Sequence, residues 1–327
     1  MTRQLLIAGF CVLLAGPSSA GETIRIHRQS LAGFADRETG IKKLTLRDPF
    51  VSAMSRFDRQ SRLLSDEDVT VEEYLDFVSL HVLQWTDAEI LSITEVVQSI
   101  EKRFRPFSLS LPEQILFVKT DGKEEGGAAY CRENAVVLPE SRIAVSRDRL
   151  ERLIVHELFH VLSSHNPELR QKLYAIIDFR TCDQISLPGS LSNRKLTNPD
   201  APLVNCVIDL RHHNQNVTVA PVLFANVDRY ESRLGGPFFR FLQFRLMVVE
   251  QDEAGWIPIE VAGAPVLLDP KKTPGYFKHI GNNTSYIIHP DEILADNFVH
   301  LILNTKDLQT PELVEQMRDV LSAADDR

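Results

Sequence analysis

Residues 146–162, SRDRLERLIVHELFHVL, predict the helix that decides how this chain folds. Ser146 is a suitable N-cap, and apolar residues recur through the segment at helical spacing. A helix this apolar is typical of one that crosses the centre of a domain. Asn166 and Pro167 follow it and predict a helix end and the start of a second helix that reaches about Ile177.

The predicted central helix contains the pattern His156-Glu157-Leu158-Phe159-His160. Side chains four positions apart project from the same helix face, so both imidazoles can reach one zinc ion. Glu157 follows the first histidine directly, which lets it accept a proton from an attacking water without binding the ion. The alternative is a buried helix whose histidines only form hydrogen bonds with the backbone, although burying such groups without a partner is costly.

A third metal ligand is expected from residues 289–298, HPDEILADNF. A hydrolytic zinc site needs three protein ligands and one open position. If Pro290 opens a helix, Glu292 and Asp296 share one face, so Glu292 can bind the ion while Asp296 accepts the outer N–H of a ligand histidine. Two alternatives stay open: a solvated acidic face on this helix, and His165 as the third ligand.

These two motifs, residues 156–160 and 292–296, together resemble the gluzincin branch of the zincin metallopeptidases. In that branch the carboxylate ligand opens a Glu-x-x-x-Asp pattern on a second helix. Residues 285–298 also resemble the catalytic site of anthrax lethal factor, where a tyrosine shortly before the glutamate assists catalysis. The resemblance implies a zincin core, zinc as cofactor and hydrolysis of peptide bonds, with Tyr286 stabilising the oxyanion or protonating the leaving amine. The separation between the motifs is far longer than in thermolysin-like enzymes.

Other residues compete with Tyr286 for this role. Tyr276, His279 and His289 lie in the same region of the sequence. An aromatic residue beside a helix start can also be a staple that packs on the core.

A substrate-binding edge is expected just before the apolar run at residues 135–138. In zincins the edge strand lines the cleft and pairs with an extended substrate, and the resemblance assigns this role to residues 126–130, GGAAY. Ala129 and Tyr130 are therefore expected to contact the substrate. An ordinary hairpin arm is the alternative.

The whole chain is expected to adopt an α+β fold with a zincin-like core. We expect a signal peptide at 1–20, a mainly helical region at 21–108, and a catalytic domain at 109–327 with a β-rich insertion at about 182–270. Thr70 with Glu73, and Thr86 with Glu89, predict helix starts by capping boxes. No element is assigned to residues 21–50. The remaining predicted elements are a strand pair at 115–118 and 135–138, β-type runs at 204–209, 217–227, 238–249 and 257–268, and helices at 290–303 and 311–321.

The N-terminus and the charge limit the location and the partners. Arg3, an apolar run from Leu5 to Leu14 and small residues before Ala20 are typical of a cleavable secretory signal, so we expect a secreted or periplasmic protein. No later segment is apolar enough to span a membrane. The formal net charge is −9, which argues against nucleic acid as a partner. The expected partner is a peptide or protein substrate; the alternative is a non-catalytic zinc-binding or interaction protein with a zincin-derived fold.

Export also changes what the cysteines are expected to do. Cys131, Cys182 and Cys206 remain after signal cleavage, and an oxidising compartment favours disulfides. Cys182 and Cys206 enclose a polar loop and form a possible disulfide, which would leave Cys131 as a buried free thiol.

Overall fold

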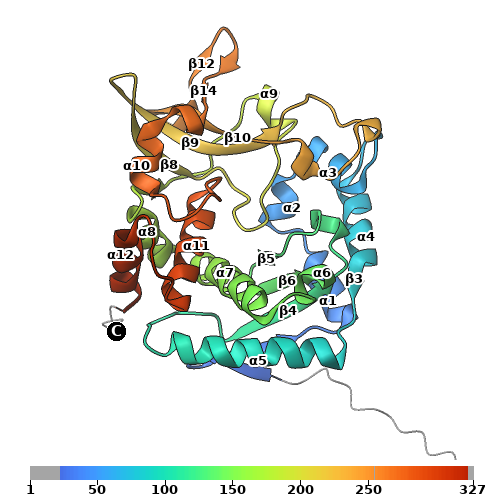
Figure 1. Ribbon diagram of the computed structural model, residues 1–327. Helices are drawn as coiled ribbons and strands as arrows, with labels where there is room; N and C mark the ends of the chain where they lie inside the picture. The colour runs from blue at the N-terminus through green and yellow to red at the C-terminus, as the bar shows by residue number, and fades with distance from the viewer. Residues whose placement is uncertain (1–22, 254, 323–327) are drawn as a thin grey trace, which may run out of the picture.

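Helices and two large β-sheets make up this α+β structure (Figure 1). The computed structural model describes residues 23–253 and 255–322, and the expected signal peptide lies outside these residues. The helices are α1 (Arg37–Leu44), α2 (Pro49–Ala53), α3 (Arg56–Leu63), α4 (Val71–His81), α5 (Asp87–Phe104), α6 (Glu140–Ile143), α7 (Arg147–His165), α8 (Pro167–Ala175), α9 (Gly189–Ser192), α10 (Pro274–Ile280), α11 (Pro290–Leu303) and α12 (Pro311–Ser322). The strands are β1 (Thr23–His27), β2 (Ser30–Phe34), β3 (Val82–Leu83), β4 (Gln114–Thr120), β5 (Tyr130–Arg132), β6 (Ala135–Pro139), β7 (Phe179–Thr181), β8 (Cys206–His212), β9 (Gln215–Ala225), β10 (Leu242–Asp252), β11 (Gly255–Pro258), β12 (Glu260–Val261), β13 (Ala264–Pro265) and β14 (Leu267–Leu268).

The first sheet combines strands from both sides of the boundary expected near residue 108. Its order is β1-β2-β4-β6-β5, and β3 pairs with β4. The predicted pair at 115–118 and 135–138 is present as β4 and β6, which run parallel, while β5 is antiparallel to β6 at the edge. β1 and β2 lie in the region 21–50, where no element was predicted, because strands this short give little periodic signal. The N-terminal region therefore contributes strands as well as helices.

Helices cover both faces of this sheet. Successive side chains of a strand point to opposite faces. Accordingly, Phe117 and Val136 belong to a core cluster shared with α5 and α7, whereas Val118 and Val137 belong to a second cluster shared with α1 and α4. Figure 1 shows α5 along the bottom of the molecule and α7 above it. The helix that carries the HExxH pattern is thus held between the sheet and the other helices.

The predicted starts of α4 and α5 are confirmed. Thr70 and Glu73 form a capping box at the start of α4, and Thr86 and Glu89 form another at the start of α5.

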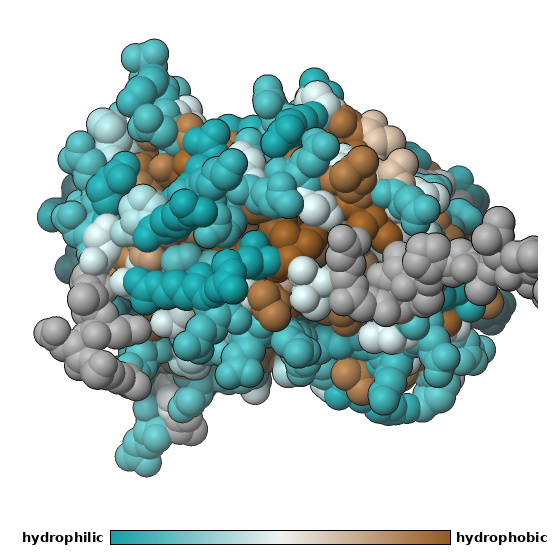
Figure 2. All heavy atoms as spheres, turned by 90° about the horizontal axis from the view of Figure 1, so that it is seen from below, coloured by the Kyte–Doolittle hydropathy of each residue, from teal (hydrophilic) through white to brown (hydrophobic). Residues whose placement is uncertain are grey.

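The outward side of α5 is polar, and the face of the molecule seen from below is mainly hydrophilic (Figure 2). None of the helices in the described ranges combines the length and the apolar composition needed to cross a membrane.

A second sheet corresponds to the expected β-rich insertion. Its order is β11-β10-β9-β8-β7, all neighbours are antiparallel, and β14 pairs with β10. It begins slightly earlier than predicted, with β7. The run expected at 257–268 is divided among four short strands, because Ala262 and Gly263 both adopt positive φ and form the turn between β12 and β13.

The predicted disulfide between Cys182 and Cys206 is wrong, since both are free thiols. Thr181, not Cys182, lies opposite Cys206 across the β7–β8 pair. Because consecutive side chains point to opposite faces, Cys206 joins the central core cluster while Cys182 packs against the cluster on the other face. Cys131 is a buried free thiol, as expected.

A buried ionic cluster joins α3 to two loops. The Arg62 guanidinium bonds to Asp58 Oδ1 at 2.7 Å and to Glu125 Oε1 at 2.6 Å, and it lies 4.4 Å from the centre of the Phe238 ring. Asp58 also accepts a hydrogen bond from the Thr197 hydroxyl at 2.6 Å. The side chains of Arg62 and Asp58 have no exposed area. The cluster therefore fixes the loop around Thr197 against the N-terminal region.

We predict that Asp58→Ala lowers the free energy of unfolding by about 3 kcal/mol, because it leaves the buried Arg62 charge with one partner fewer. Urea denaturation followed by circular dichroism measures this. Glu101→Ala, which removes a pair with the exposed Arg105 side chain, serves as the control and should cost much less, because solvent screens the charge of Arg105. Equal decreases in the free energy of unfolding in the two variants would show that the buried cluster stabilises the fold no more than the Glu101–Arg105 ion pair does.

Candidate metal centre

Helices α7 and α11 pack against each other and carry the residues predicted to bind metal (Figure 1). α7 begins directly after Ser146, as predicted, but continues to His165 rather than ending at Leu162. α11 begins at Pro290, as predicted, and its N-cap is the His289 side chain. The small Ala295 is fully buried in the core cluster that both helices share. The two motifs are thereby placed side by side.

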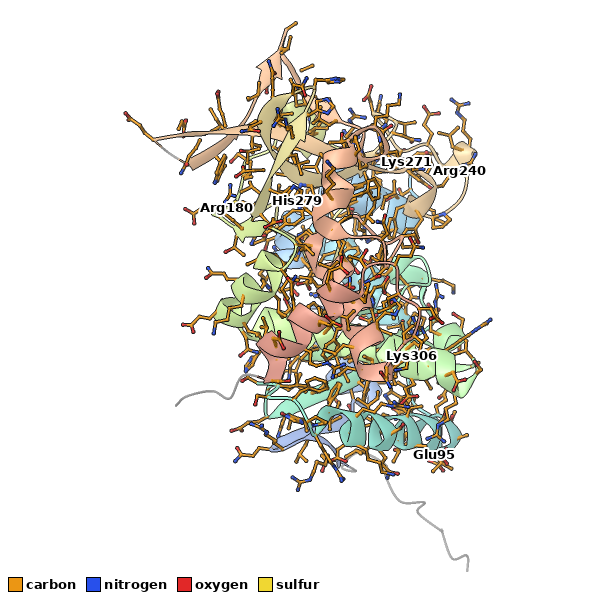
Figure 3. The ribbon with its side chains drawn as sticks, turned by 60° about the vertical axis from the view of Figure 1, so that its left-hand side comes forward. Glu95, Arg180, Arg240, Lys271, His279 and Lys306 are labelled. Carbon is orange, nitrogen blue, oxygen red and sulfur yellow. The ribbon has the colours of Figure 1, made fainter. Side chains whose placement is uncertain are left out.

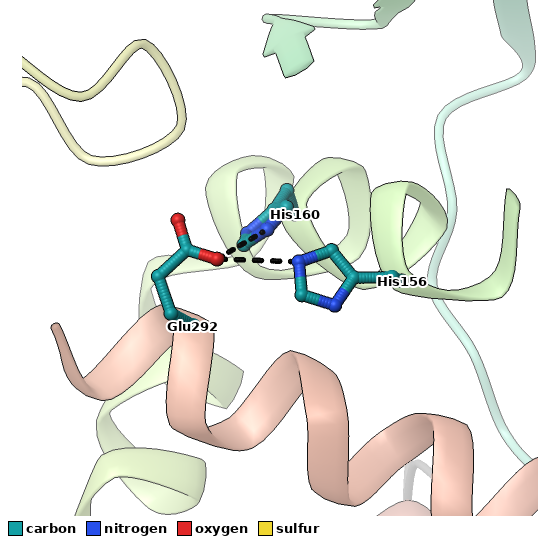
Figure 4. Close-up of side chains that lie close together, drawn as sticks. All are labelled: His156, His160 and Glu292. Carbon is teal, nitrogen blue, oxygen red and sulfur yellow. Dashed lines mark hydrogen bonds and ion pairs between the residues drawn. The ribbon is translucent and has the colours of Figure 1, made fainter. Parts of the chain in front are cut away.

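His156, His160 and Glu292 converge on one point between the two helices (Figure 4). Glu292 Oε2 lies 3.2 Å from His156 Nε2 and 3.4 Å from His160 Nε2. One ligand atom from each residue lies within 4.8 Å of the other two. Glu292 is almost completely buried, at 1% exposure, so its helix does not present the solvated acidic face that was the alternative.

The outer nitrogens of both histidines are held by carboxylates of α11. His156 Nδ1 lies 3.1 Å from Asp296 Oδ1, the partner that the sequence predicted. His160 Nδ1 lies 2.8 Å from Asp291 Oδ2, a partner that sequence reasoning missed. Asp291 directly precedes the predicted ligand Glu292 in the sequence. This position was the one sequence signal that could have indicated its role. With each Nδ1 paired to a carboxylate, both Nε2 atoms are directed at the same point.

The donor atoms at this point suit a divalent metal ion. Within the described residues, the buried His160 Nε2 has no hydrogen-bond partner, although Glu292 is near it. A buried imidazole nitrogen without a partner is costly, and a metal ion would satisfy it. Two imidazole nitrogens and one carboxylate oxygen form a donor set that zinc commonly takes at catalytic sites. The residues present therefore fit zinc.

Asn198 holds the other oxygen of Glu292. Its Nδ2 donates to Glu292 Oε1 at 2.6 Å, which leaves Oε2 facing the histidines. Asn198 follows Thr197, the residue that the buried Asp58–Arg62 cluster fixes. Sequence reasoning treated this segment as a polar loop, because nothing local in an Asn-Pro-Asp turn indicates that it reaches a distant helix.

Glu157 is buried directly beside the predicted ligands. Its carboxylate Oε2 lies 3.4 Å from Cys131 Sγ, and together with Asp200 these residues form a second compact group of possible donor atoms. Asp200 Oδ1 accepts a hydrogen bond from the backbone N–H of Cys131 at 2.6 Å. Burial raises the pKa of Glu157, and the neighbouring histidines oppose this shift. Asp200 was not predicted as part of the site.

Tyr286 lies over the His156 ring. The two rings are nearly parallel, at 22°, with centres 6.3 Å apart. The tyrosine is 41% exposed and lines the same cavity as His156, Glu157 and Glu292. Desolvation, followed by the nearby Glu292 carboxylate, raises the pKa of Tyr286, so its hydroxyl keeps its proton.

The competing residues do not line the cavity that Tyr286 lines. Tyr276 is buried and donates to the carbonyl of Ile287. His279, labelled in Figure 3, is partly exposed and pairs with Asp178 at 2.7 Å. His289 caps α11, and the exposed His165 ends α7. Among these candidates, Tyr286 therefore lines the cavity that contains His156 and Glu157, whereas His289 lines a second cavity next to His160.

The expected edge strand borders a cavity of about 480 Å³ at the metal centre. Ala128 and Ala129 line this cavity, and β5 follows them at the open edge of the first sheet. Tyr130 points differently: its side chain is buried in the cluster with Tyr74. β5 is also the arm of a hairpin with β6, so the edge and hairpin interpretations describe one strand.

Comparisons of this chain with protein-family models, with curated proteins and with solved structures found no match.

We predict a pH-dependent loss of stability in protein freed of metal by a chelator. Desolvation opposes protonation of His156, but its bonds to Asp296 and Glu292 outweigh this and raise its pKa from 6.5 to about 10. Protonated His156 therefore stabilises the fold fully below about pH 6.5, and this contribution is lost as the pH rises through about 10. Urea midpoints across this range measure the effect.

Asp296→Asn should flatten this pH dependence, because the amide carries no charge to hold the proton on His156. Asp178→Asn, which alters the surface pair with His279, is the matched control and should behave like the unmodified protein. A curve unchanged by Asp296→Asn would contradict the assignment.

Proposed function

We propose that this protein is a zinc-dependent metallopeptidase that acts outside the cytoplasm. The observation that carries the proposal is the convergence of His156, His160 and Glu292 on one point, with the Glu157 carboxylate buried beside it. Two imidazoles and a carboxylate as ligands, together with a free carboxylate as base, are the parts that hydrolysis by a zinc peptidase requires. A purely structural metal site has no need of Glu157.

His156, His160 and Glu292 would hold the ion, and the open side of the site faces the cavity. Zinc bound there supplies a Lewis acid that polarises a peptide carbonyl and lowers the pKa of water. Asp296, Asp291 and Asn198 orient the three ligands by the hydrogen bonds described above.

Glu157 acts as the general base. It accepts a proton from the attacking water and then delivers this proton to the amine of the departing peptide. Burial raises the pKa of its carboxyl group, which makes the carboxylate a stronger base than an exposed one. The thiol of Cys131, 3.4 Å away, helps to fix its position.

Tyr286 donates its hydroxyl hydrogen to the negative charge that develops on the substrate carbonyl oxygen. Such a contact contributes about 3 kcal/mol where it has been removed from other enzymes. The raised pKa of Tyr286 keeps the donor protonated.

The substrate backbone lies along Ala128 and Ala129, whose small side chains permit a close approach. The backbone N–H of Cys131 in the adjacent edge strand already bonds Asp200. The substrate backbone therefore pairs with the residues before Cys131, or Asp200 moves away from Cys131 when the substrate binds.

Glu157→Gln should keep zinc but lower kcat by at least about 100-fold, because it removes the base and not a ligand. His156→Ala should lose both zinc and turnover. Elemental analysis and hydrolysis of a mixed peptide pool, with a chelator arm, measure the two properties.

Two variants on the same helix provide the controls. Glu151→Gln alters a carboxylate bonded to Ser99 and Arg103, and His165→Ala alters an exposed histidine; both should keep zinc and activity. Full activity in Glu157→Gln would contradict its role as base, and zinc binding without turnover in the unmodified protein would favour a non-catalytic zinc protein.

Asp291→Asn should weaken zinc binding by about 10- to 100-fold, because His160 loses the carboxylate that orients its ring. Competition with a fluorescent zinc chelator measures the affinity. Asp121→Asn alters a similar, partly buried aspartate–histidine pair away from the metal centre, with His81, and should leave the affinity unchanged. Equal affinities in both variants would remove Asp291 from the site.

A further inference from the structure

The cavity at the metal centre extends along the N-terminal half of α7, where its wall is positively charged. Three arginines line this part: Arg142 of α6, and Arg149 and Arg152 of α7. Arg152 is four residues and Arg149 seven residues before His156, so both lie on the helix face that carries the first predicted ligand. Arg142 is fixed at the edge-strand side, where its Nε donates to the carbonyl of Gly127 at 2.8 Å.

These arginines lack acidic partners in the protein. Within the described residues, none of the three forms an ion pair within 4.0 Å. Two neighbouring arginines differ: Arg103 pairs with Glu151, and Arg147 pairs with Glu95, which lies on α5 at the bottom of Figure 3. Unpaired arginines are notable in a chain whose formal net charge is −9.

Four carboxylates line the same cavity, and all of them lie at the metal centre. Glu292 and Asp296 bond His156, Asp200 accepts a hydrogen bond from the backbone N–H of Cys131, and Glu157 accepts one from the Cys131 thiol. Within the described residues, none of these carboxylates forms an ion pair with the three arginines. The counter-charge for Arg142, Arg149 and Arg152 has to come from solvent ions or from a ligand in the cavity.

The other lining of this part suits a peptide side chain. Val145, Leu153 and Val299 provide an apolar surface next to the arginines. A glutamate or aspartate side chain places its methylene groups against such a surface and its carboxylate against a guanidinium, which binds carboxylates with a matched fork of N–H donors.

We infer that the cavity selects peptides that carry a carboxylate on the α6–α7 side of the scissile bond. This inference rests on the proposed peptidase function. The carboxylate can belong to an acidic side chain or to a free peptide C-terminus, because the arginines recognise the same group in both. We therefore expect the protein to prefer peptides that carry a negatively charged group, although its own net charge is negative.

Cleavage profiling tests the preference directly. The zinc-loaded protein is incubated with peptide pools that differ by Glu, Gln or Lys in a neutral background, each with a free or an amidated C-terminus, and products are identified by mass spectrometry. We expect acidic residues, or the free C-terminus, to be enriched on a single side of the cut. The enrichment should weaken as salt rises, because exposed charges are screened.

Charge-reversal variants assign the preference to the cavity. Arg149→Glu and Arg152→Glu should each lower kcat/KM for acidic peptides by about tenfold, because an attraction is replaced by a repulsion. They should raise kcat/KM for the lysine peptides. Arg147→Glu is the matched control: it reverses an exposed arginine on the same helix that pairs with Glu95 instead of lining the cavity.

A binding measurement separates this inference from the proposed function. Fluorescent Glu and Lys peptides are titrated into zinc-loaded Glu157→Gln protein, with and without Arg152→Glu, and anisotropy is recorded. Tighter binding of Glu peptides that Arg152→Glu abolishes supports the inference even if the unmodified protein cleaves nothing, an outcome that would overturn the peptidase proposal alone. Cleavage or binding without acidic preference, or a preference unchanged in both reversal variants, overturns the inference.

Discussion

Mutual pairing of buried charged groups at the contact between α7 and α11 is the constraint on which the structure depends. His160 is 2% exposed, while Asp291 and Glu292 are each 1% exposed. Isolated buried charges at these positions would be strongly destabilising. Each histidine instead has its Nδ1 against an aspartate of α11, and these two pairs favour the observed register of the two helices. The same pairing directs both Nε2 atoms to one point.

The segment around Thr197 links this contact to the N-terminal region. Asp58 and Arg62 hold Thr197, the next residue Asn198 bonds Glu292, and Asp200 bonds the edge strand. The centre is therefore assembled from three parts of the chain, and the N-terminal helices take part in it through α3.

The charges are distributed according to distance from the centre. Acidic groups meet the histidines and, under our proposal, a divalent cation, while arginines without acidic partners line the cavity further along α7. An anionic ligand group would thus be attracted to one end of the cavity while its carbonyl approached the other. This arrangement would orient a bound peptide along the cavity. The net charge of the whole chain does not indicate such an orientation.

The sequence by itself determined the local features, because these depend on residues close together in the chain. Helix periodicity and caps located α4, α5, α7 and α11, and helical spacing paired His156 with His160 and Glu292 with Asp296. It could not determine β1 and β2, which are too short to show a period, or the thiols of Cys182 and Cys206, whose separation depends on strand register. Only the tertiary structure decided that Asp291 and Asn198 contact the candidate ligands and that Arg149 and Arg152 line the cavity. The physical reason is that such contacts depend on how distant helices and loops pack, and local spacing carries no record of that.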